Sequence, residues 1–230
     1  MLLSKSQANY HPAPSLPQRH LSMAAVSGWN HSKGKRILDL FLASVSLLLA
    51  FPLIALVALL VRVTSPGPVF FRQIRSGKGG RSFHLIKFRT MRWELNDTGP
   101  KVTRTGDPRI TGIGRILRKW KFDELPQLWN VVRGDMSFVG PRPDVPEYLA
   151  TLSEEQAAIL NLRPGLTGEA TLQYRHEERL LSSVRGEDLN RFYCSRILPQ
   201  KVQLDLDYAQ KAGFASDVVI LLRTFYAIFN

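Results

Sequence analysis

The sequence predicts an α+β protein in which one apolar N-terminal helix precedes a small, helix-rich domain. Three observations lead to this prediction. Residues 40–61 carry no charged side chain, and that length is enough to cross the apolar core of a bilayer. Apolar segments at 69–73 and 82–88 flank a glycine-rich turn, which is typical of two strands in a hairpin. Further on, apolar residues recur at helical spacing, first over residues 113–120.

Composition narrows the classes of function. The chain has 230 residues, of which 44% are hydrophobic, and a formal net charge of +12. Such a charge indicates an anionic partner, which is nucleic acid, an acidic membrane surface or a phosphorylated substrate. The single cysteine, Cys194, excludes an intrachain disulfide and a cysteine metal site, and it fits a reducing compartment.

Residues 1–33 are expected to form a disordered tail. They are polar, contain four prolines or glycines and show little periodicity. They do not resemble a signal peptide, because the apolar segment begins too late and lacks a small-residue cleavage site in the right place.

The apolar segment within residues 34–65 has two interpretations. The simpler one is a single spanning helix. However, Pro52 near its middle removes a backbone hydrogen bond and kinks a helix. Basic residues, which mark the cytoplasmic side of a membrane, also flank both ends. A kinked helix that enters one leaflet and returns would satisfy both features. From this pattern alone, neither alternative is favoured.

The segment from Arg62 to Arg92 contains eight lysines and arginines and no acid. Contact with anionic lipid headgroups explains part of this charge. Lys87 and Arg89, however, alternate with apolar residues, so they could instead point together into a phosphate site.

Two adjacent acids, Asp123 and Glu124, follow a strongly basic run. Asp123 is expected to cap a helix that tolerates Pro126 in its first turn and stops at Gly134. The N-terminal end of a helix favours anions, so an ionised carboxylate and a substrate phosphate could both be held there. Alternatively, Asp123 is only a cap and Glu124 a solvated acid. The two interpretations are compatible, because a cap can also be a nucleophile.

Two arginines lie in rigid surroundings. Arg142 stands between two prolines, and Arg163 precedes Pro164 and Gly165. Restricted backbone freedom suits a guanidinium that must meet a phosphate with two hydrogen bonds. The alternative for Arg142 is a structural turn with an exposed side chain.

A final helix is predicted after Ser216. It is short and is interrupted by Arg223, so it is not expected to span a membrane. It could pack on the domain or lie in the membrane interface.

Taken together, these segments resemble the bacterial sugar transferases, in particular the monotopic polyprenyl-phosphate phosphoglycosyl transferases. The resemblance runs from about residue 34 to the C-terminus, with several blocks in the right order and spacing. The matching segments are Lys35-Arg36-Ile37-Leu38-Asp39, the apolar segment around Pro52, Lys87-Phe88-Arg89-Thr90-Met91, Asp123-Glu124-Leu125-Pro126-Gln127-Leu128, Gly134-Asp135-Met136-Ser137-Phe138-Val139-Gly140-Pro141-Arg142-Pro143 and Arg163-Pro164-Gly165-Leu166-Thr167-Gly168.

The resemblance implies a fold and a place in the cell. Residues 34–65 would be a re-entrant membrane helix broken at Phe51 and Pro52, and residues 66–230 a cytoplasmic catalytic domain at the membrane face. The protein would sit at the inner (cytoplasmic) membrane of a bacterium, with its active domain on the cytoplasmic side.

The resemblance also implies a reaction. A sugar-1-phosphate would pass from a nucleoside diphosphate sugar, with uridine as the family expectation, to polyprenyl (undecaprenyl) phosphate. UMP would be released in this first membrane step of a bacterial glycan pathway. The partners would be the nucleotide sugar, polyprenyl phosphate and membrane lipid, and a homo-oligomer stays open.

Site residues follow by the same resemblance. Asp123 would be the nucleophile that forms a covalent aspartyl-phosphosugar intermediate, and Glu124 would be its partner. Mg²⁺ would sit at this dyad, with both carboxylates as ligands. The basic residues expected to contact substrate phosphates are Lys87, Arg118, Arg142 and Arg163.

The chain departs from the family pattern at two places. Family members often carry serine before the membrane proline, where this chain has Phe51. A serine hydroxyl helps to satisfy backbone groups freed at a kink, so a spanning helix stays open. After Gly168, many members continue with a Trp-Gln pattern that this chain lacks, and therefore the donor sugar is not predicted.

Other functions fit less of the sequence. A non-enzymatic membrane adaptor that binds anionic lipid explains the charge and the apolar segment, but not two rigid arginines and an acidic pair. A nucleic-acid partner is not expected, because no helix-turn-helix, zinc or aromatic RNA motif is evident. A nucleotide-sugar hydrolase would share the first chemical step and use water in the second.

Overall fold

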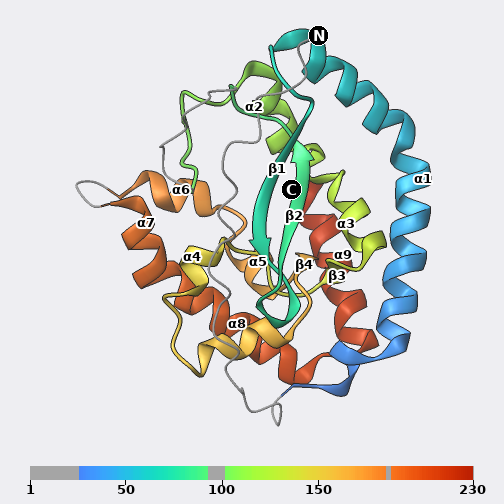
Figure 1. Ribbon diagram of the computed structural model, residues 1–230, viewed down its shortest axis with the longest axis vertical. Coiled ribbons are helices and arrows are strands. Elements are labelled where there is room, and N and C mark those ends of the chain that lie inside the picture. Colours follow the sequence, from blue (N-terminus) through green and yellow to red (C-terminus); the bar gives the residue numbers. More distant parts are fainter. Residues whose placement is uncertain (1–25, 93–101, 185–187, 230) are drawn as a thin grey trace, which may run out of the picture.

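A computed structural model describes residues 26–92, 102–184 and 188–229 of the chain. These residues form a mixed helix-and-sheet structure in which one long helix runs along the side of the domain (Figure 1). The α+β prediction and the single long apolar helix before the domain are confirmed.

The described residues contain two small sheets. Strands β1 (Phe70–Ser76) and β2 (Ser82–Phe88) form an antiparallel hairpin, and β3 (Ser137–Val139) and β4 (Gly165–Thr167) form a parallel pair. The hairpin confirms the two strands predicted around the glycine-rich turn. The helical elements are η2 (Gly28–His31), α1 (Lys33–Thr64), η3 (Lys78–Gly80), α2 (Gly112–Lys119), η4 (Phe122–Glu124), α3 (Gln127–Arg133), α4 (Pro146–Leu149), η5 (Gln156–Asn161), α5 (Glu169–Gln173), α6 (Glu177–Ser182), α7 (Leu189–Phe192), η6 (Tyr193–Ile197), α8 (Leu198–Lys211) and α9 (Phe214–Phe229).

The hairpin register determines which side chains share a face. Phe71 lies opposite Lys87, and Arg75 lies opposite Phe83. Directly opposite residues of an antiparallel pair project to the same face, and so do residues two apart along one strand. Lys87 and Arg75, at opposite ends of the hairpin, are therefore on one face.

Helix α1 begins where the Ser32 hydroxyl accepts a hydrogen bond from the Lys35 backbone N–H at 3.0 Å. It continues without interruption through Pro52 to Thr64, so the predicted break at Phe51 and Pro52 is not confirmed. By length and composition it is long and apolar enough to cross a membrane. Its inner side buries Ala43, Val57 and Val61, while its outer side leaves large apolar side chains exposed, namely Ile37, Phe41, Val45, Leu48, Leu49, Phe51, Leu56, Leu59 and Val63. An exposed apolar surface of this extent marks an interaction site, and a membrane is one candidate.

Polar contacts fix the first turns of α1 to the domain. The Asp39 carboxylate accepts hydrogen bonds from the Ser137 hydroxyl and the Phe138 backbone N–H, both at 3.0 Å. The Arg36 guanidinium donates to the carbonyl oxygens of Val131 and Val132 at 2.7 and 2.8 Å. These carbonyls belong to the last turn of α3, and that of Val131 also accepts from the backbone N–H of the C-cap residue Gly134 at 3.0 Å.

A buried ion pair joins α1 to α9. The ammonium of Lys35 contacts the carboxylate of Asp217, and the two side chains are 6% and 3% exposed. Asp217 also accepts hydrogen bonds from the Tyr208 hydroxyl and, at 2.9 Å, from the Trp29 indole N–H. Buried charges are tolerated when they are paired and hydrogen-bonded, and Asp217 meets both conditions.

The predicted tail of residues 1–33 needs a correction at its C-terminal end. Residues 1–25 lie outside the described residues. The segment from residue 26, however, is folded and contains η2. The Ser27 hydroxyl donates to the Ala212 carbonyl, and the Asn30 amide donates to the Ala209 carbonyl at 2.9 Å. Its order comes from contacts with a part of the chain distant in sequence.

The predicted helix start at Asp123 is also wrong. Asp123 lies in the short 3-10 turn η4, and α3 starts only at Gln127, after Pro126. Pro126 has no N–H to continue a hydrogen-bonded helix from the turn. The predicted stop at Gly134 is confirmed, because this residue has a φ of 91°, in the left-handed region that favours glycine.

The buried ion pair between α1 and α9 gives a stability prediction. Lys35→Met would leave Asp217 buried without its counter-charge, so we expect a loss of about 3–5 kcal/mol in the free energy of unfolding. Equilibrium unfolding in detergent micelles, followed by tryptophan fluorescence, measures this loss. Lys33→Met, at an exposed position two residues earlier, is the control and should cost less than about 0.5 kcal/mol. Equal effects of the two substitutions would contradict the assignment.

Candidate active site

The acidic dyad lies in η4, between α2 and α3 and against β2. The turn is entered through Lys121, which has a φ of 57°, the one positive value among the described non-glycine residues. This left-handed residue separates α2 from the turn, and Asp123 within the turn is buried, at 6% exposed. A strained conformation of this kind persists where the surrounding structure enforces it.

Glu124 is paired with Arg142. The two guanidinium nitrogens of Arg142 face the two carboxylate oxygens of Glu124, one pair being 3.4 Å apart and the other closer. Burial by itself would raise the pKa of Glu124, but the charge and hydrogen bonds of Arg142 outweigh it and lower the pKa to about 2. Glu124 is therefore ionised at any physiological pH.

The loop that carries Arg142 is fixed by the parallel strand pair. The backbone N–H of Gly140 donates to the Thr167 carbonyl at 2.9 Å, and the N–H of Gly165 donates to the Pro141 carbonyl at 2.8 Å. Pro141 and Pro143 are buried on either side of Arg142. These two hydrogen bonds attach the segment that follows β3 to β4, and they support the rigidity predicted for Pro-Arg-Pro.

Asp123 is in a different state from its neighbour. Its Oδ1 atom is buried and has no hydrogen-bond partner among the described residues. Burial and the charge of Glu124 raise its pKa, and the positive charges of Lys87, Lys121 and Arg118 oppose this increase. One dyad member is thus held in an ion pair, while the other has a buried oxygen without a hydrogen-bond partner.

Lys87 and Arg118 reach the dyad from different elements. Lys87 projects from β2, with its ammonium 5.2 Å from the centre of the Phe71 ring. Burial lowers its pKa to about 8, although the carboxylates of the dyad act in the opposite direction. Arg118, in the last turn of α2, donates from Nε to the Thr90 hydroxyl at 2.9 Å and from Nη1 to Glu178 at 3.1 Å.

The structure brings together Lys87, Arg118, Arg142 and the two acids, but it places Arg163 elsewhere. Arg163 lines a separate pocket at the tip of the hairpin, together with Lys78 and Gly134. Its charge acts on the pKa values of His31 and Lys78. Its position therefore does not support the predicted phosphate contact beside Asp123.

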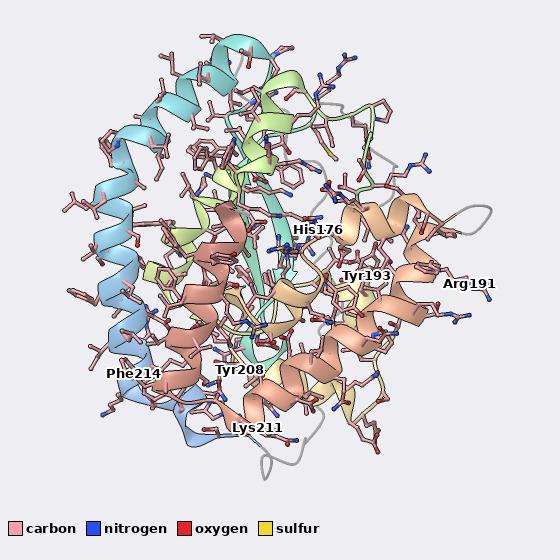
Figure 2. All side chains as sticks on the ribbon, turned by 180° about the vertical axis from the view of Figure 1, so that it is seen from behind. His176, Arg191, Tyr193, Tyr208, Lys211 and Phe214 are labelled. Atoms are coloured by element: carbon pink, nitrogen blue, oxygen red, sulfur yellow. The ribbon has the colours of Figure 1, made fainter. Side chains whose placement is uncertain are left out.

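A support network behind Arg142 was not predicted. Arg75, from β1, donates to the Pro143 carbonyl at 3.2 Å and lies 3.5 Å from the Asp144 carboxylate. The other Asp144 oxygen accepts from the Tyr193 hydroxyl at 3.0 Å, and Lys201 donates to that same hydroxyl at 3.1 Å. Figure 2 shows Tyr193 directed toward the middle of the molecule, whereas Arg191, two residues earlier, points outward.

Part of this network has a signal in the sequence. Arg75 lies on β1 with the same alternation that places Lys87 on that face of the hairpin, so the strand pattern could have identified it. Asp144, Tyr193 and Lys201 have no such local signal. Tyr193 is buried in an apolar cluster around α8, and Asp144 and Lys201 precede Val145 and Val202 of the same cluster.

The dyad meets some requirements of the predicted magnesium site. Among the described residues no group of three or more His, Cys, Asp or Glu side chains could hold a metal ion. Mg²⁺, however, is often bound through one or two carboxylates, with water and substrate phosphates as its other ligands. The buried Oδ1 of Asp123 has no hydrogen-bond partner among the described residues, whereas both Glu124 oxygens face Arg142. The residues therefore fit a metal that the substrate largely coordinates.

Comparison with known proteins gives the family. The family model described as bacterial sugar transferase matches residues 30–230. A UDP-glucose:undecaprenyl-phosphate glucose-1-phosphate transferase of Caulobacter vibrioides is 41% identical over 195 residues, covering 83% of this chain and 67% of the relative. An undecaprenyl-phosphate glucose phosphotransferase of Komagataeibacter xylinus is 40% identical over 212 residues, 89% of this chain but 37% of the relative.

A third relative is of similar length. The exopolysaccharide production protein ExoY of Rhizobium meliloti is 35% identical over 209 residues, which cover 84% of each chain. The family match extends over the hairpin, the dyad and the Arg142 loop. The chain belongs to the bacterial sugar transferase family.

Proposed function

We propose that this protein transfers a sugar-1-phosphate from a UDP-sugar to undecaprenyl phosphate and releases UMP. The observation that carries the proposal is a buried carboxylate, Asp123, with one oxygen free and with Lys87, Arg118 and the Arg142–Glu124 pair around it. The relatives named as undecaprenyl-phosphate sugar-phosphate transferases support it.

In the first step a carboxylate oxygen of Asp123 attacks the phosphorus that bears the sugar. The bond between this phosphorus and the oxygen of UMP breaks, UMP leaves, and an acyl phosphate forms on Asp123. The donor diphosphate is anionic and repels a carboxylate. The charges of Lys87, Arg118 and Arg142 reduce this repulsion and stabilise the phosphoryl oxygens during transfer.

Glu124 acts as a positioning residue in this scheme. With a pKa near 2, it does not exchange a proton at neutral pH. Its role is to hold Arg142, whose side chain remains 37% exposed and can therefore still meet a substrate phosphate. The arginine thus keeps a fixed orientation before the substrate arrives.

Magnesium would be held by Asp123 and the substrate diphosphate, whereas the oxygens of Glu124, the second predicted ligand, face Arg142. When bound, the ion would offset negative charge on the diphosphate. The chain's own basic residues would supply the remaining compensation.

In the second step an oxygen of undecaprenyl phosphate attacks the phosphorus of the aspartyl-phosphosugar. The bond to the Asp123 oxygen breaks, which regenerates the free carboxylate and leaves a diphosphate-linked sugar on the lipid. No bond to the sugar carbon breaks, so the configuration at that carbon is unchanged. A hydrolase would differ only here, with water in place of the lipid phosphate.

The exposed apolar surface would seat this site at the membrane. We propose that α1, which is one continuous helix in the structure, bends at Pro52 in the membrane, so that it enters one leaflet and returns and both of its ends face the cytoplasm. Exposed aromatic residues near the dyad, Trp120 and Trp129, would lie at the headgroup level, where tryptophan is enriched. The acceptor phosphate lies at that depth too, so the lipid would reach the site by lateral diffusion.

The nucleophile assignment is tested with Asp123→Asn. The amide has almost the same shape but cannot form the acyl phosphate, so UMP release should fall by roughly 10³-fold or more while the chain stays folded. The assay measures UMP from a panel of UDP-sugars, with and without undecaprenyl phosphate. Asp207→Asn, at an exposed position on α8, is the matched control and should retain activity. Undiminished turnover of Asp123→Asn would refute the assignment, and release that needs no acceptor would indicate a hydrolase.

The lowered pKa of Lys87 predicts a pH dependence. Lys87 is charged below a pH of about 8 and becomes neutral as the pH rises through this value, so kcat/KM should fall there. In Lys87→Arg the cation persists above pH 12, and this decrease should disappear even if the value at pH 7 is lower. Lys119→Arg, an exposed neighbour of the dyad, should keep the native profile. The same alkaline decrease in both variants would exclude Lys87 as its cause.

The membrane arrangement is tested by cysteine labelling. Cys194→Ser removes the native thiol, and single cysteines are placed at Lys33 and Thr64, the two ends of α1. A re-entrant helix predicts that a membrane-impermeant reagent reaches neither cysteine in intact cells and both in inverted membrane vesicles. Labelling of one end from the periplasm would establish a spanning helix instead.

A further inference from the structure

A second basic pocket lies at the tip of the β1–β2 hairpin, away from the dyad. Its volume is about 580 Å³, and its lining residues are Gly77, Lys78, Gly79, Arg81, Ser82, Phe83, Gly134, Asp135 and Arg163. Lys87 is five residues from Ser82 along β2, which corresponds to roughly 16 Å in an extended strand. The pocket is therefore a separate place on the surface.

Positive charge dominates this pocket. Three of its lining residues, Lys78, Arg81 and Arg163, are cationic, and Asp135 is the one acid. That carboxylate already accepts a hydrogen bond from Asn130 at 3.2 Å and lies 3.6 Å from Arg133. Within the part of the chain that the structure describes, the guanidinium groups of Arg81 and Arg163 have no hydrogen bond and no ion pair.

The cations at the pocket repel one another. The Lys78 ammonium is 3.0 Å from Nδ1 of His31. Burial and the charge of Arg163 lower the pKa of Lys78, and burial, Lys78 and Arg163 lower the pKa of His31. The charge of Arg163 also lowers the pKa of Arg36 and favours the ionised form of the Asp39 carboxyl. A bound anion would relieve the repulsion among these cations.

The pocket wall exposes backbone. A Cβ atom at Gly77 would lie 3.1 Å from the Arg81 carbonyl oxygen and 3.2 Å from the Phe83 ring, so a side chain there would crowd the turn. Gly79 has a φ of 69° and nothing within 4 Å of its Cβ position. A ligand can thus approach the turn between the arginines without meeting a side chain from these glycines.

We propose that this pocket binds a phosphorylated anion, independently of the site at Asp123. Arginine and lysine side chains bind phosphate oxygens through charge-assisted hydrogen bonds, and the volume accepts a ligand of the size of a sugar phosphate. The pocket adjoins the start of α1, since a Cβ at Gly134 would lie 3.4 Å from the Arg36 guanidinium. The phosphate could therefore belong to a soluble ester or to an anionic lipid headgroup.

A reporter at the pocket rim tests the proposal. The full chain carries Cys194→Ser and Ser82→Cys, is labelled with an environment-sensitive fluorophore, and is placed in phosphatidylcholine nanodiscs. Titration with inorganic pyrophosphate should give a saturating change. In Lys78→Gln/Arg163→Gln the same change should need at least about tenfold more pyrophosphate, because two charge-assisted contacts are lost.

The matched control is Arg191→Gln/Arg196→Gln. It removes two exposed cations from α7 and η6, and Arg191 lies on the opposite side of the molecule from α1 (Figure 2). Its titration should be within about twofold of the native chain, because its charges are distant and screened by salt. Thermal unfolding of each variant establishes that it is folded.

A second set of nanodiscs contains phosphatidylglycerol. If the ligand is a lipid headgroup, this lipid alone should change the reporter in the native chain and not in Lys78→Gln/Arg163→Gln. No response to either pyrophosphate or phosphatidylglycerol, or equal responses of the native chain and the pocket variant, would overturn the proposal. UMP release is measured separately. It tests the proposed reaction, whereas the fluorescence titrations test only the proposed pocket.

Discussion

The ion pair between Arg142 and Glu124 is the interaction on which the candidate active site depends. Two adjacent carboxylates at a buried turn repel each other, and each disfavours the ionised form of the other. Arg142 keeps Glu124 ionised, because its guanidinium contacts both carboxylate oxygens and lowers the pKa of this acid. The charge of the ionised Glu124, together with burial, then raises the pKa of Asp123. The dyad is thereby divided into a member that orients a cation and a member with an unsatisfied oxygen.

That ion pair requires the rest of the domain to keep the Arg142 loop in place. The parallel strands β3 and β4 fix the loop through Gly140 and Gly165, and Arg75 and Asp144 support it from behind. Strand β3 also binds α1, since Ser137 and Phe138 donate hydrogen bonds to Asp39 on that helix. The apolar helix and the site loop are therefore joined through one short strand. This arrangement provides a physical reason for the strand pair to lie at the centre of the domain.

Local patterns in the sequence predicted the elements whose causes are local. Strand alternation and a glycine-rich turn predicted the hairpin, and Gly134 predicted the end of α3. The cap assigned to Asp123 failed because Pro126 and the left-handed Lys121 produce a separate turn before the helix. The order of residues 26–33, the support network around Tyr193 and the location of Arg163 depend on contacts between distant parts of the chain. A single sequence without homologues contains no signal for such contacts.

The unsatisfied oxygen of Asp123 has a consequence for anyone who engineers this protein. A buried acceptor without a partner, beside a second acid, is locally unfavourable for the fold. A screen for thermal stability alone would therefore select apolar or amide replacements at this position, and it would discard the group that the chemistry needs. Directed evolution of this chain toward robustness should hold residue 123 constant and seek its gains elsewhere, for example on the exposed faces of α7 and α8.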